Sequence, residues 1–222
     1  MEKEWSTDEL KQIAQQLGKP DGPSGIATAE RMAENNGGMT ARTIQVMDVS
    51  EHDNILEIGP GNAAHLHLLF DLLTTGHYVG VDIAPTMIQE AERINSALVK
   101  SQQASFELTD GEHLPFEDGT FDKIFTVNTL YFWKDPVKYP VEIYRVLKPG
   151  GVLVMTITDK SFMEKLPFTQ YGFQLYDRVA STEVLTQAGF VIDSVSEEVD
   201  STTGMLGQTV ERDILIIKAV KS

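Results

Sequence analysis

The sequence predicts an α/β fold, with helices on both faces of a mostly parallel, doubly wound sheet. From residue 53 onward, short apolar runs alternate with helical stretches. Runs such as YVGVDI are continuously apolar, which is typical of parallel strands buried on both faces. The last two apolar runs are joined by DSTTGMLGQT, which is too short for a crossover helix, so they should form an antiparallel hairpin.

The N-terminal part of the chain predicts helices and loops only. Ser6 and Glu9 have the spacing of a capping box, so a helix should begin just after the serine. The segment GKPDGPSG at 18–25 should end it, and two further helices are expected at 26–35 and 39–50.

Residues 1–50 are therefore expected to form a helical cap on one domain, residues 51–222. Parallel strands are predicted at 54–58, 77–82, 104–108, 121–127 and 151–158. Helices are predicted between them at 62–74, 85–100 and 137–146. A helix ended by Gly189 should follow, and then hairpin strands at 190–199 and 211–220.

The composition limits the possible partners. The 222 residues carry a formal net charge of −15, and no cluster of Lys and Arg offsets it, so nucleic acid is not an expected partner. The absence of cysteine excludes disulfides and thiolate metal sites and fits a cytoplasmic location. The first ten residues lack the apolar core of a signal peptide, and no apolar run reaches the roughly 20 residues of a membrane span.

A glycine-rich turn follows the first predicted strand, in NILEIGPGNAAHLHLL. Gly59, Gly61 and Ala64 fit the G-x-G-x-x-G/A pattern of dinucleotide-binding loops. Glycine lets the backbone approach a ligand closely, and a following helix would direct its N-terminal amides at that ligand. A plain strand-to-helix turn explains the same glycines, because this pattern alone is weak.

Asp82 ends the second predicted strand, about 20 residues after the glycines, where an acid would bind ribose hydroxyls. It would equally suit the cap of the helix that begins at Pro85. The glycine turn and Asp82 together favour a ligand that contains adenosine, without separating NAD from other adenosine cofactors.

Two further features do separate these cofactors. Glu57 precedes the turn and gives E-x-G-x-G-x-A, in which Ala63 is the third small residue. Asp110 and Gly111 follow the third strand, where a carboxylate would accept the adenine amino group and a backbone amide would reach a ring nitrogen. A tight turn is the alternative explanation for this Asp-Gly pair.

Four segments between residues 52 and 158 resemble, in order and spacing, the motifs of class I S-adenosylmethionine-dependent methyltransferases: ILEIGPGNA, YVGVDIAPTMI, LTDGEHLPFEDGTFDKIFTVNTLYFW and RVLKPGGVLVMTI. The type 11-like group, similar to ubiquinone/menaquinone-biosynthesis C-methyltransferases, is nearest. The resemblance implies a Rossmann-like seven-stranded sheet of order 3-2-1-4-5-7-6 and S-adenosyl-L-methionine as cofactor. Ala63 departs from the third glycine of the motif, which is a frequent variant.

The resemblance also implies a set of cofactor-binding residues: Glu57, Gly59, Gly61, Asp82, Ile83, Asp110, Gly111 and Asn128. The glutamate would lie near the methionine amino group and steady the loop, and the first two glycines would let the methionyl portion lie against the backbone. Asp82 would bind both ribose hydroxyls, Ile83 would pack on the adenine, and the Asp-Gly pair would meet the adenine edge. Asn128 would lie beside the transferring methyl.

Methyl transfer from a sulfonium is an in-line displacement that mainly needs alignment and a dry site. A base is needed only where the acceptor must lose a proton, and Tyr131 and His113 are the candidates for it. His65 and His67 lie two apart on a predicted helix, so they point in different directions and no metal site is expected.

Two aromatic stretches are expected near the acceptor. In TLYFWKDP, Tyr131 and Trp133 would border the acceptor, whereas Phe132 is expected in the core. The insert at 159–178 would form a lid, together with the N-terminal cap, over an apolar or aromatic acceptor. A small satellite core is the alternative for this insert.

The sequence thus predicts methyl transfer from S-adenosylmethionine to a small, apolar or aromatic molecule. One alternative is a cofactor-binding sensor or interaction module that catalyses nothing. Another is an NAD-dependent oxidoreductase, against which Glu57, the Asp110-Gly111 pair and the terminal hairpin argue.

Overall fold

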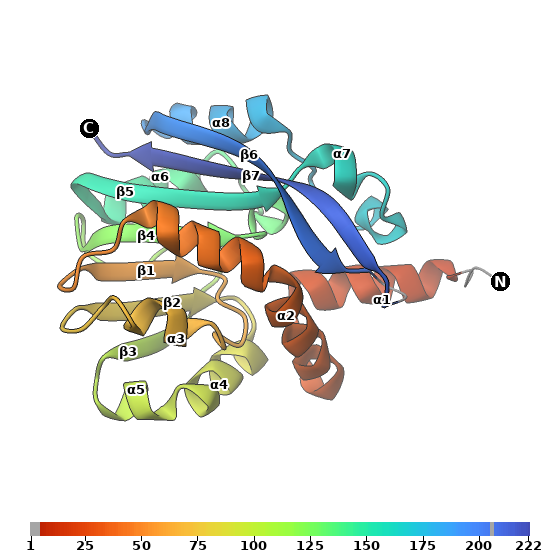
Figure 1. Ribbon diagram of the computed structural model, residues 1–222, viewed down its shortest axis with the longest axis horizontal. Coiled ribbons are helices and arrows are strands. Elements are labelled where there is room, and N and C mark those ends of the chain that lie inside the picture. The colour runs from red at the N-terminus through yellow and green to blue at the C-terminus, as the bar shows by residue number, and fades with distance from the viewer. Residues whose placement is uncertain (1–4, 205–206) are drawn as a thin grey trace.

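The computed structural model describes residues 5–204 and 207–222; part of the predicted cap (1–4) and of the hairpin connection (205–206) lies outside these ranges. The described strands are β1 (Asn54–Ile58), β2 (His77–Asp82), β3 (Ala104–Leu108), β4 (Phe121–Val127), β5 (Leu147–Thr158), β6 (Val191–Thr203) and β7 (Thr209–Val220). They form one sheet in the order β3-β2-β1-β4-β5-β7-β6, so the predicted order is confirmed (Figure 1). β7 runs antiparallel to β5 and β6, and the other neighbouring strands are parallel.

The described helices are α1 (Thr7–Gly18), α2 (Gly22–Met47), α3 (Leu66–Phe70), α4 (Pro85–Ile94), α5 (Ser96–Lys100), α6 (Tyr139–Val146), α7 (Lys160–Met163) and α8 (Arg178–Gln187), with short 3₁₀ helices η1 (Leu130–Phe132) and η2 (Pro167–Gln170). The predicted capping box of α1 is confirmed, because Ser6 Oγ accepts the Glu9 amide and the Glu9 carboxylate accepts the Ser6 amide. In the part of the chain that is described, no helix has both the length and the apolar character of a membrane span.

Alternate strand residues face two separate cores, which explains why the strands are continuously apolar. On one face, Ile55 and Val154 pack with residues of α2 and α3. On the other face, Leu56 and Leu153 pack with residues of α6 and α8. Helices therefore cover both faces of the sheet, as a doubly wound fold requires (Figure 1).

Helix α2 is continuous where a loop and two separate helices were expected. The loop between α1 and α2 is only three residues long, because Pro23 lies in the first turn of α2, where a missing N–H costs no hydrogen bond. Glycines in the middle of α2 do not end the helix. Its C-terminal half buries Met39, Ile44 and Met47 against the sheet.

Two other predicted helices are shorter than expected. The stretch predicted at 62–74 is helical only at Leu66–Phe70, since Ala63 has a φ of +50° and interrupts the pattern. The stretch predicted at 85–100 forms α4 and α5, with Asn95 between them. Asn95 Nδ2 donates to the carbonyls of Ala63 and Ala91, which fixes the break.

Strand ends also extend beyond the prediction. β5 begins at Leu147 rather than at Gly151, with a register shift against β4. The hairpin strands β6 and β7 run to Thr203 and from Thr209, which lengthens the hairpin toward the N-terminal helices (Figure 1).

Helix α2 crosses this hairpin closely at Gly38. A Cβ atom on Gly38 would lie 2.6 Å from Oδ1 of Asp200, a buried residue of β6. A Cβ atom on the preceding Gly37 would meet nothing within 4 Å. The close approach of helix and hairpin therefore depends on Gly38 and not on its neighbour.

We predict opposite effects for alanine at these two glycines. Gly38→Ala should lower the free energy of unfolding by about 2 kcal/mol, because Asp200 must shift out of a packed position. Gly37→Ala should raise it by about 0.5 kcal/mol, because alanine is the better helix former. Urea unfolding followed by circular dichroism measures both, and equal effects for the two variants would contradict the close contact.

Candidate functional site

The predicted site residues follow the carboxyl ends of four neighbouring strands. β1 lies between β2 and β4, in register at Ile58 with Val81 and Thr126. After β1 the chain continues to β2 and β3 on one side of β1, and β4 then lies on the other side. The loop after β1 is therefore at the point where the strand order reverses. Ligands of open α/β sheets bind at such a point.

The loop after β1 needs its two glycines for different reasons. Gly59 has a φ of +70°, and a Cβ atom there would lie 2.5 Å from Cγ2 of Thr129. Gly61 has a φ of +57°, and a Cβ atom there would meet no protein atom within 4 Å. Both line a pocket, and α3 begins only at Leu66, so the loop itself rather than a helix N-terminus borders the pocket.

Asp82 links this loop to the loop after β2. Its Oδ2 accepts the Gly61 amide at 3.3 Å, and its Oδ1 accepts the Ala84 amide at 2.8 Å. Burial raises the pKa of Asp82 to about 6, although hydrogen bonds from the amides of Ala84, Gly61 and Ile83 oppose that rise. The carboxylate is therefore ionised near neutral pH, but only just.

Glu57 does not line the pocket. Its buried carboxylate accepts the Tyr78 hydroxyl at 2.5 Å and lies 2.8 Å from His65 Nε2. Burial lowers the pKa of His65, but the charge and hydrogen bond of Glu57 outweigh it and raise that pKa overall. His65 is thus held by a carboxylate, while His67 Nδ1 contacts the Ala64 carbonyl, and the two histidines share no ligand position.

The loop after β3 contributes Asp110 and Gly111 to the pocket. Asp110 accepts His113 Nδ1 at 2.9 Å and the amides of Glu112 and His113, which holds its pKa well below the usual range. His113 itself is exposed and does not line the pocket. Lys134 Nζ donates to the Asp110 carbonyl and pairs with Glu112, so Lys134 lies beside this loop.

Asn128, directly after β4, also lines the pocket, in a left-handed conformation with a φ of +57°. Its Oδ1 accepts the Thr158 amide at 2.9 Å. Tyr131 lies behind Asn128, with its buried hydroxyl 2.8 Å from the Thr158 carbonyl and 3.0 Å from Asn128 Oδ1. Burial raises the pKa of Tyr131, and Tyr131 does not line the pocket, so the geometry does not favour it as a base.

The pocket is a cleft with a cavity volume of about 110 Å³. Seven of the predicted residues line it: Gly59, Gly61, Asp82, Ile83, Asp110, Gly111 and Asn128. Glu57, His113 and Tyr131 do not, and all binding roles remain predictions.

Sequence reasoning expected Trp133 near the acceptor, and it lines the pocket, but the other residues of the same wall were not predicted. That wall comes from the N-terminal helices and from the segment after β4, and includes Leu17, Pro20, Met32, Phe132 and Tyr139. Their positions depend on how distant elements pack, and no local pattern marks them. Phe132 was expected in the core; it lines the pocket because α1 presents Gly18 to it, where a Cβ atom would lie 2.9 Å from the ring.

Tyr139 was also not predicted, and it brings a polar group to the pocket. It begins α6, is buried, and lines the pocket together with Asp82 and Asp110. Burial raises its pKa, and the two carboxylates add to that rise. Among the described residues no hydrogen-bond partner of its hydroxyl is found, so the hydroxyl is available to a ligand.

The aromatic insert at 159–178 packs beside the pocket rather than lining it. The ring centroid of Phe173 lies 4.6 Å from that of Phe132 and 5.8 Å from that of Phe168. Lys11 of α1 lies over the Tyr171 ring. The insert therefore supports Phe132 and α1 from behind, and its role as a lid stays a prediction.

Comparison with known proteins decides the family. The methyltransferase domain family matches residues 56–155. An uncharacterized methyltransferase, YdaC of Bacillus subtilis (strain 168), is 30% identical over 127 residues, which cover 57% of this chain and 67% of that protein. The chain belongs to the class I S-adenosylmethionine-dependent methyltransferases.

Other relatives are longer than the matched segment. Malonyl-[acyl-carrier protein] O-methyltransferase of Marinomonas sp. (strain MWYL1) is 24% identical over 138 residues, which are 62% of this chain and 50% of that enzyme. Phosphoethanolamine N-methyltransferase 1 of Arabidopsis thaliana is 27% identical over 207 residues, which are 86% of this chain and 40% of that enzyme. The chain thus spans half or less of these two relatives.

Solved structures share the fold of this methyltransferase. A chain from the complex of the Haloferax volcanii Trm112 methyltransferase activator with a methyltransferase has a TM-score of 0.71 at 20% identity and covers 94% of this chain and 96% of its own. A SAM-dependent methyltransferase from Aquifex aeolicus has a TM-score of 0.67 at 19% identity, and the match covers 99% of this chain and 100% of that one. A geranyl diphosphate methyltransferase in complex with GPP and sinefungin has a TM-score of 0.68 at 14% identity, and the match covers 83% of this chain and 78% of that one.

The cofactor of this methyltransferase family, S-adenosylmethionine, fits the residues present. The open space above Gly61 admits a ligand against the backbone, and Asp82 offers a carboxylate to hydroxyl donors. Ile83 and Tyr139 add an apolar surface and a free hydroxyl at the same end of the pocket. The family assignment thus decides between this cofactor and NAD.

The His65–Glu57 pair of the methyltransferase predicts a pH-dependent stability. The raised pKa of His65 means that the folded state holds its proton more tightly than the unfolded state does. The stabilisation is therefore complete below the ordinary pKa of 6.5 and is lost as the pH rises through the folded value. His65→Gln should lower the free energy of unfolding more at about pH 6 than at about pH 9.

Urea unfolding at several pH values measures this difference. His67→Gln is the matched control, because His67 lies in α3, which begins directly after His65, and contacts a carbonyl instead of a carboxylate. If His65→Gln lowered the free energy of unfolding by the same amount at every pH, His65 would not hold its proton more tightly in the folded state, and the prediction would be wrong.

Proposed function

We propose that this enzyme transfers the methyl group of S-adenosylmethionine to a small, uncharged molecule with an apolar or aromatic surface. The carrying observation is the chemical composition of the pocket lining. Its charged residues, Asp82, Asp110 and Lys134, come from the end of β2 and from the segments after β3 and η1. The N-terminal helices and η1 add Leu17, Pro20, Met32 and Phe132, all without charge.

The charged lining residues suit the adenosine. Asp82 would accept the ribose hydroxyls on oxygens that already hold two loop amides. Ile83, Gly111 and the Tyr139 hydroxyl would surround the adenine, and Asp110 would accept its amino group. A carboxylate-rich pocket in a chain of net charge −15 also favours a cationic sulfonium.

The uncharged lining residues suit the acceptor. With the methionyl portion along Gly59 and Gly61, the methyl would face the space between Asn128 and Phe132. Apolar walls there would exclude water from the displacement, in which the bond from methyl to sulfur breaks as the new bond forms. The sulfonium leaves as a neutral thioether.

The titratable side chains among the described lining residues are Asp82, Asp110, Lys134 and Tyr139. They lie near one another, because Lys134 donates to the Asp110 carbonyl and both carboxylates raise the pKa of Tyr139. With adenosine bound beside them, none would be left at the acceptor. We therefore propose an acceptor whose nucleophilic atom needs no side chain of the pocket as its base. The named relatives do not select an acceptor, because their names include both an O- and an N-methyltransferase. The likeness to ubiquinone/menaquinone enzymes, the cytoplasmic location and the lid role of the insert stay predictions of the sequence.

A labelling screen tests the function. The enzyme is incubated with S-adenosylmethionine labelled in its methyl group and a metabolite extract, and products are identified by mass spectrometry. We expect label in a small, uncharged product, and no such product with Asp82→Asn. Label found only in protein or nucleic acid, or in a charged product, would contradict the proposed acceptor class.

The ribose role of Asp82 predicts a pH-dependent affinity. Only the ionised carboxylate accepts two hydroxyl donors, so binding weakens as the pH falls below the Asp82 pKa of about 6. S-adenosylhomocysteine should bind about tenfold more weakly at pH 5 than at pH 8 by calorimetry. Asp82→Asn should bind weakly at both values.

Asp110→Asn is the control for this measurement, since the pKa of Asp110 lies well below the tested range. It should keep the pH ratio of the unmodified protein. If Asp82→Asn bound S-adenosylhomocysteine as tightly as the unmodified protein does, Asp82 would not bind the ribose and the proposal would be contradicted.

A further inference from the structure

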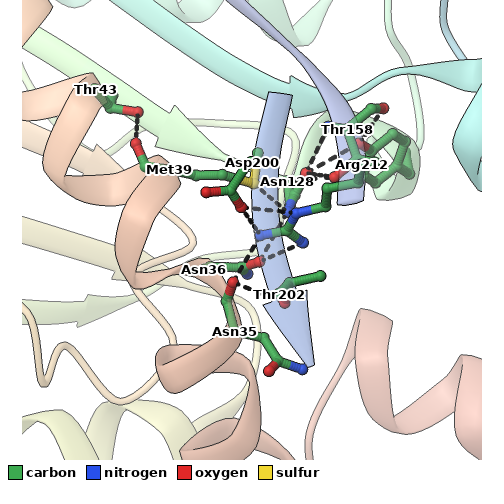
Figure 2. A network of polar contacts seen from close by, with 10 residues as sticks. Asn35, Asn36, Met39, Thr43, Asn128, Thr158, Asp200, Thr202 and Arg212 are labelled. Atoms are coloured by element: carbon green, nitrogen blue, oxygen red, sulfur yellow. Dashed lines mark hydrogen bonds and ion pairs between the residues drawn. The ribbon is translucent and has the colours of Figure 1, made fainter. Parts of the chain in front are cut away.

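A buried ion pair joins the two strands of the terminal hairpin (Figure 2). Arg212 of β7 donates from Nε and Nη2 to Asp200 Oδ2, at 3.0 and 2.8 Å. The two side chains are only 8% and 7% exposed. Such a pair adds little net stability, because desolvation offsets the attraction between the charges.

The guanidinium reaches beyond its carboxylate to helix α2. Arg212 Nη2 donates to the Asn35 carbonyl at 2.6 Å, and Nη1 donates to Asn36 Oδ1 at 3.2 Å. Thr202 Oγ1 of β6 donates to the same Asn35 carbonyl at 3.2 Å. The hairpin therefore holds one turn of α2 by several directed bonds, as Figure 2 shows.

Asn36 connects Arg212 to a residue of the pocket. Its Oδ1 also accepts Asn128 Nδ2, at 3.1 Å. Asn128 Oδ1 accepts the Thr158 amide at 2.9 Å, so the carboxamide is fixed at both ends and cannot be reversed without losing bonds at each. Asn128 lines the pocket, whereas Asn36 and Arg212 do not.

The same turn of α2 also sets the cover of the pocket. Gly38 lies against Asp200, and four residues before Asn36 the helix presents Met32 to the pocket. Arg212 thus fixes both Asn128 and the helix that carries Met32. The hairpin, α2 and the end of β4 come together only in the folded protein.

We propose that Arg212 is a positioning residue for the methionyl end of the cofactor, acting through Asn36 on Asn128. This inference rests on the proposed function, because it takes the pocket as the site of S-adenosylmethionine. Arg212 itself touches no ligand. It orients the carboxamide beside the methyl group and holds α2 over it.

Two probes separate the ends of the pocket. Adenosine reaches only the end with Asp82 and Asp110, whereas S-adenosylhomocysteine also extends to Asn128. Asn36→Ala breaks the link from Arg212 to Asn128 and leaves the ion pair in place. The double variant Arg212→Met with Asp200→Leu removes the pair without leaving an unpaired buried charge.

Calorimetric titration of both probes tests the proposal. Each variant should bind S-adenosylhomocysteine about tenfold more weakly than the unmodified protein and adenosine with unchanged affinity, since coupling through such networks is of order 1 kcal/mol. Arg178→Met with Glu197→Leu is the matched control, because that pair on β6 and α8 is 59% and 58% exposed. It should bind both probes as the unmodified protein does.

Other outcomes overturn the proposal in distinguishable ways. Unchanged binding of S-adenosylhomocysteine in Asn36→Ala overturns the positioning role and leaves the proposed function standing. Equal loss of both probes shows a general structural role and overturns it as well. If the unmodified protein binds neither probe, the proposed function falls together with the inference. If the double variant does not fold, Asn36→Ala decides alone.

Discussion

The site of this methyltransferase depends on one buried carboxylate. Asp82 holds the Gly61 amide of one loop and the Ala84 amide of the next, and so joins the two loops that leave β1 and β2. The parallel register of these strands brings the loops side by side. Burial raises the pKa of Asp82 to about 6, so the ionised carboxylate benefits from each further donor, which is what a ribose would supply.

The pocket is completed by parts of the chain that lie outside the strand-helix repeat. The N-terminal helices contribute Leu17 and Met32, and the terminal hairpin holds α2 in place through Arg212. In the proposed function, the Rossmann-like sheet would bind the adenosine and the added elements would border the acceptor. This division agrees with a family in which one cofactor serves many acceptors.

Much of the fold could be predicted from the sequence, because buried parallel strands are continuous apolar runs. β1 to β4 have the predicted bounds, and the site residues lie at or just after their ends, as Asp82 ends β2. Contacts between distant elements could not be predicted. Asn128 meets Asn36 across 92 positions, and Tyr131 turns toward Thr158 instead of the pocket, and neither arrangement has a local signal. The continuity of α2 was missed because a glycine that packs against the hairpin, Gly38, resembles a helix end in the sequence.

A crystal structure with S-adenosylhomocysteine would show whether the loops joined by Asp82 hold the cofactor. We expect both ribose hydroxyls within hydrogen-bond distance of the Asp82 carboxylate, with the adenine beside Ile83 and Gly111. We also expect the homocysteine sulfur toward Asn128. A ligand bound elsewhere, or with its ribose away from Asp82, would contradict this expectation.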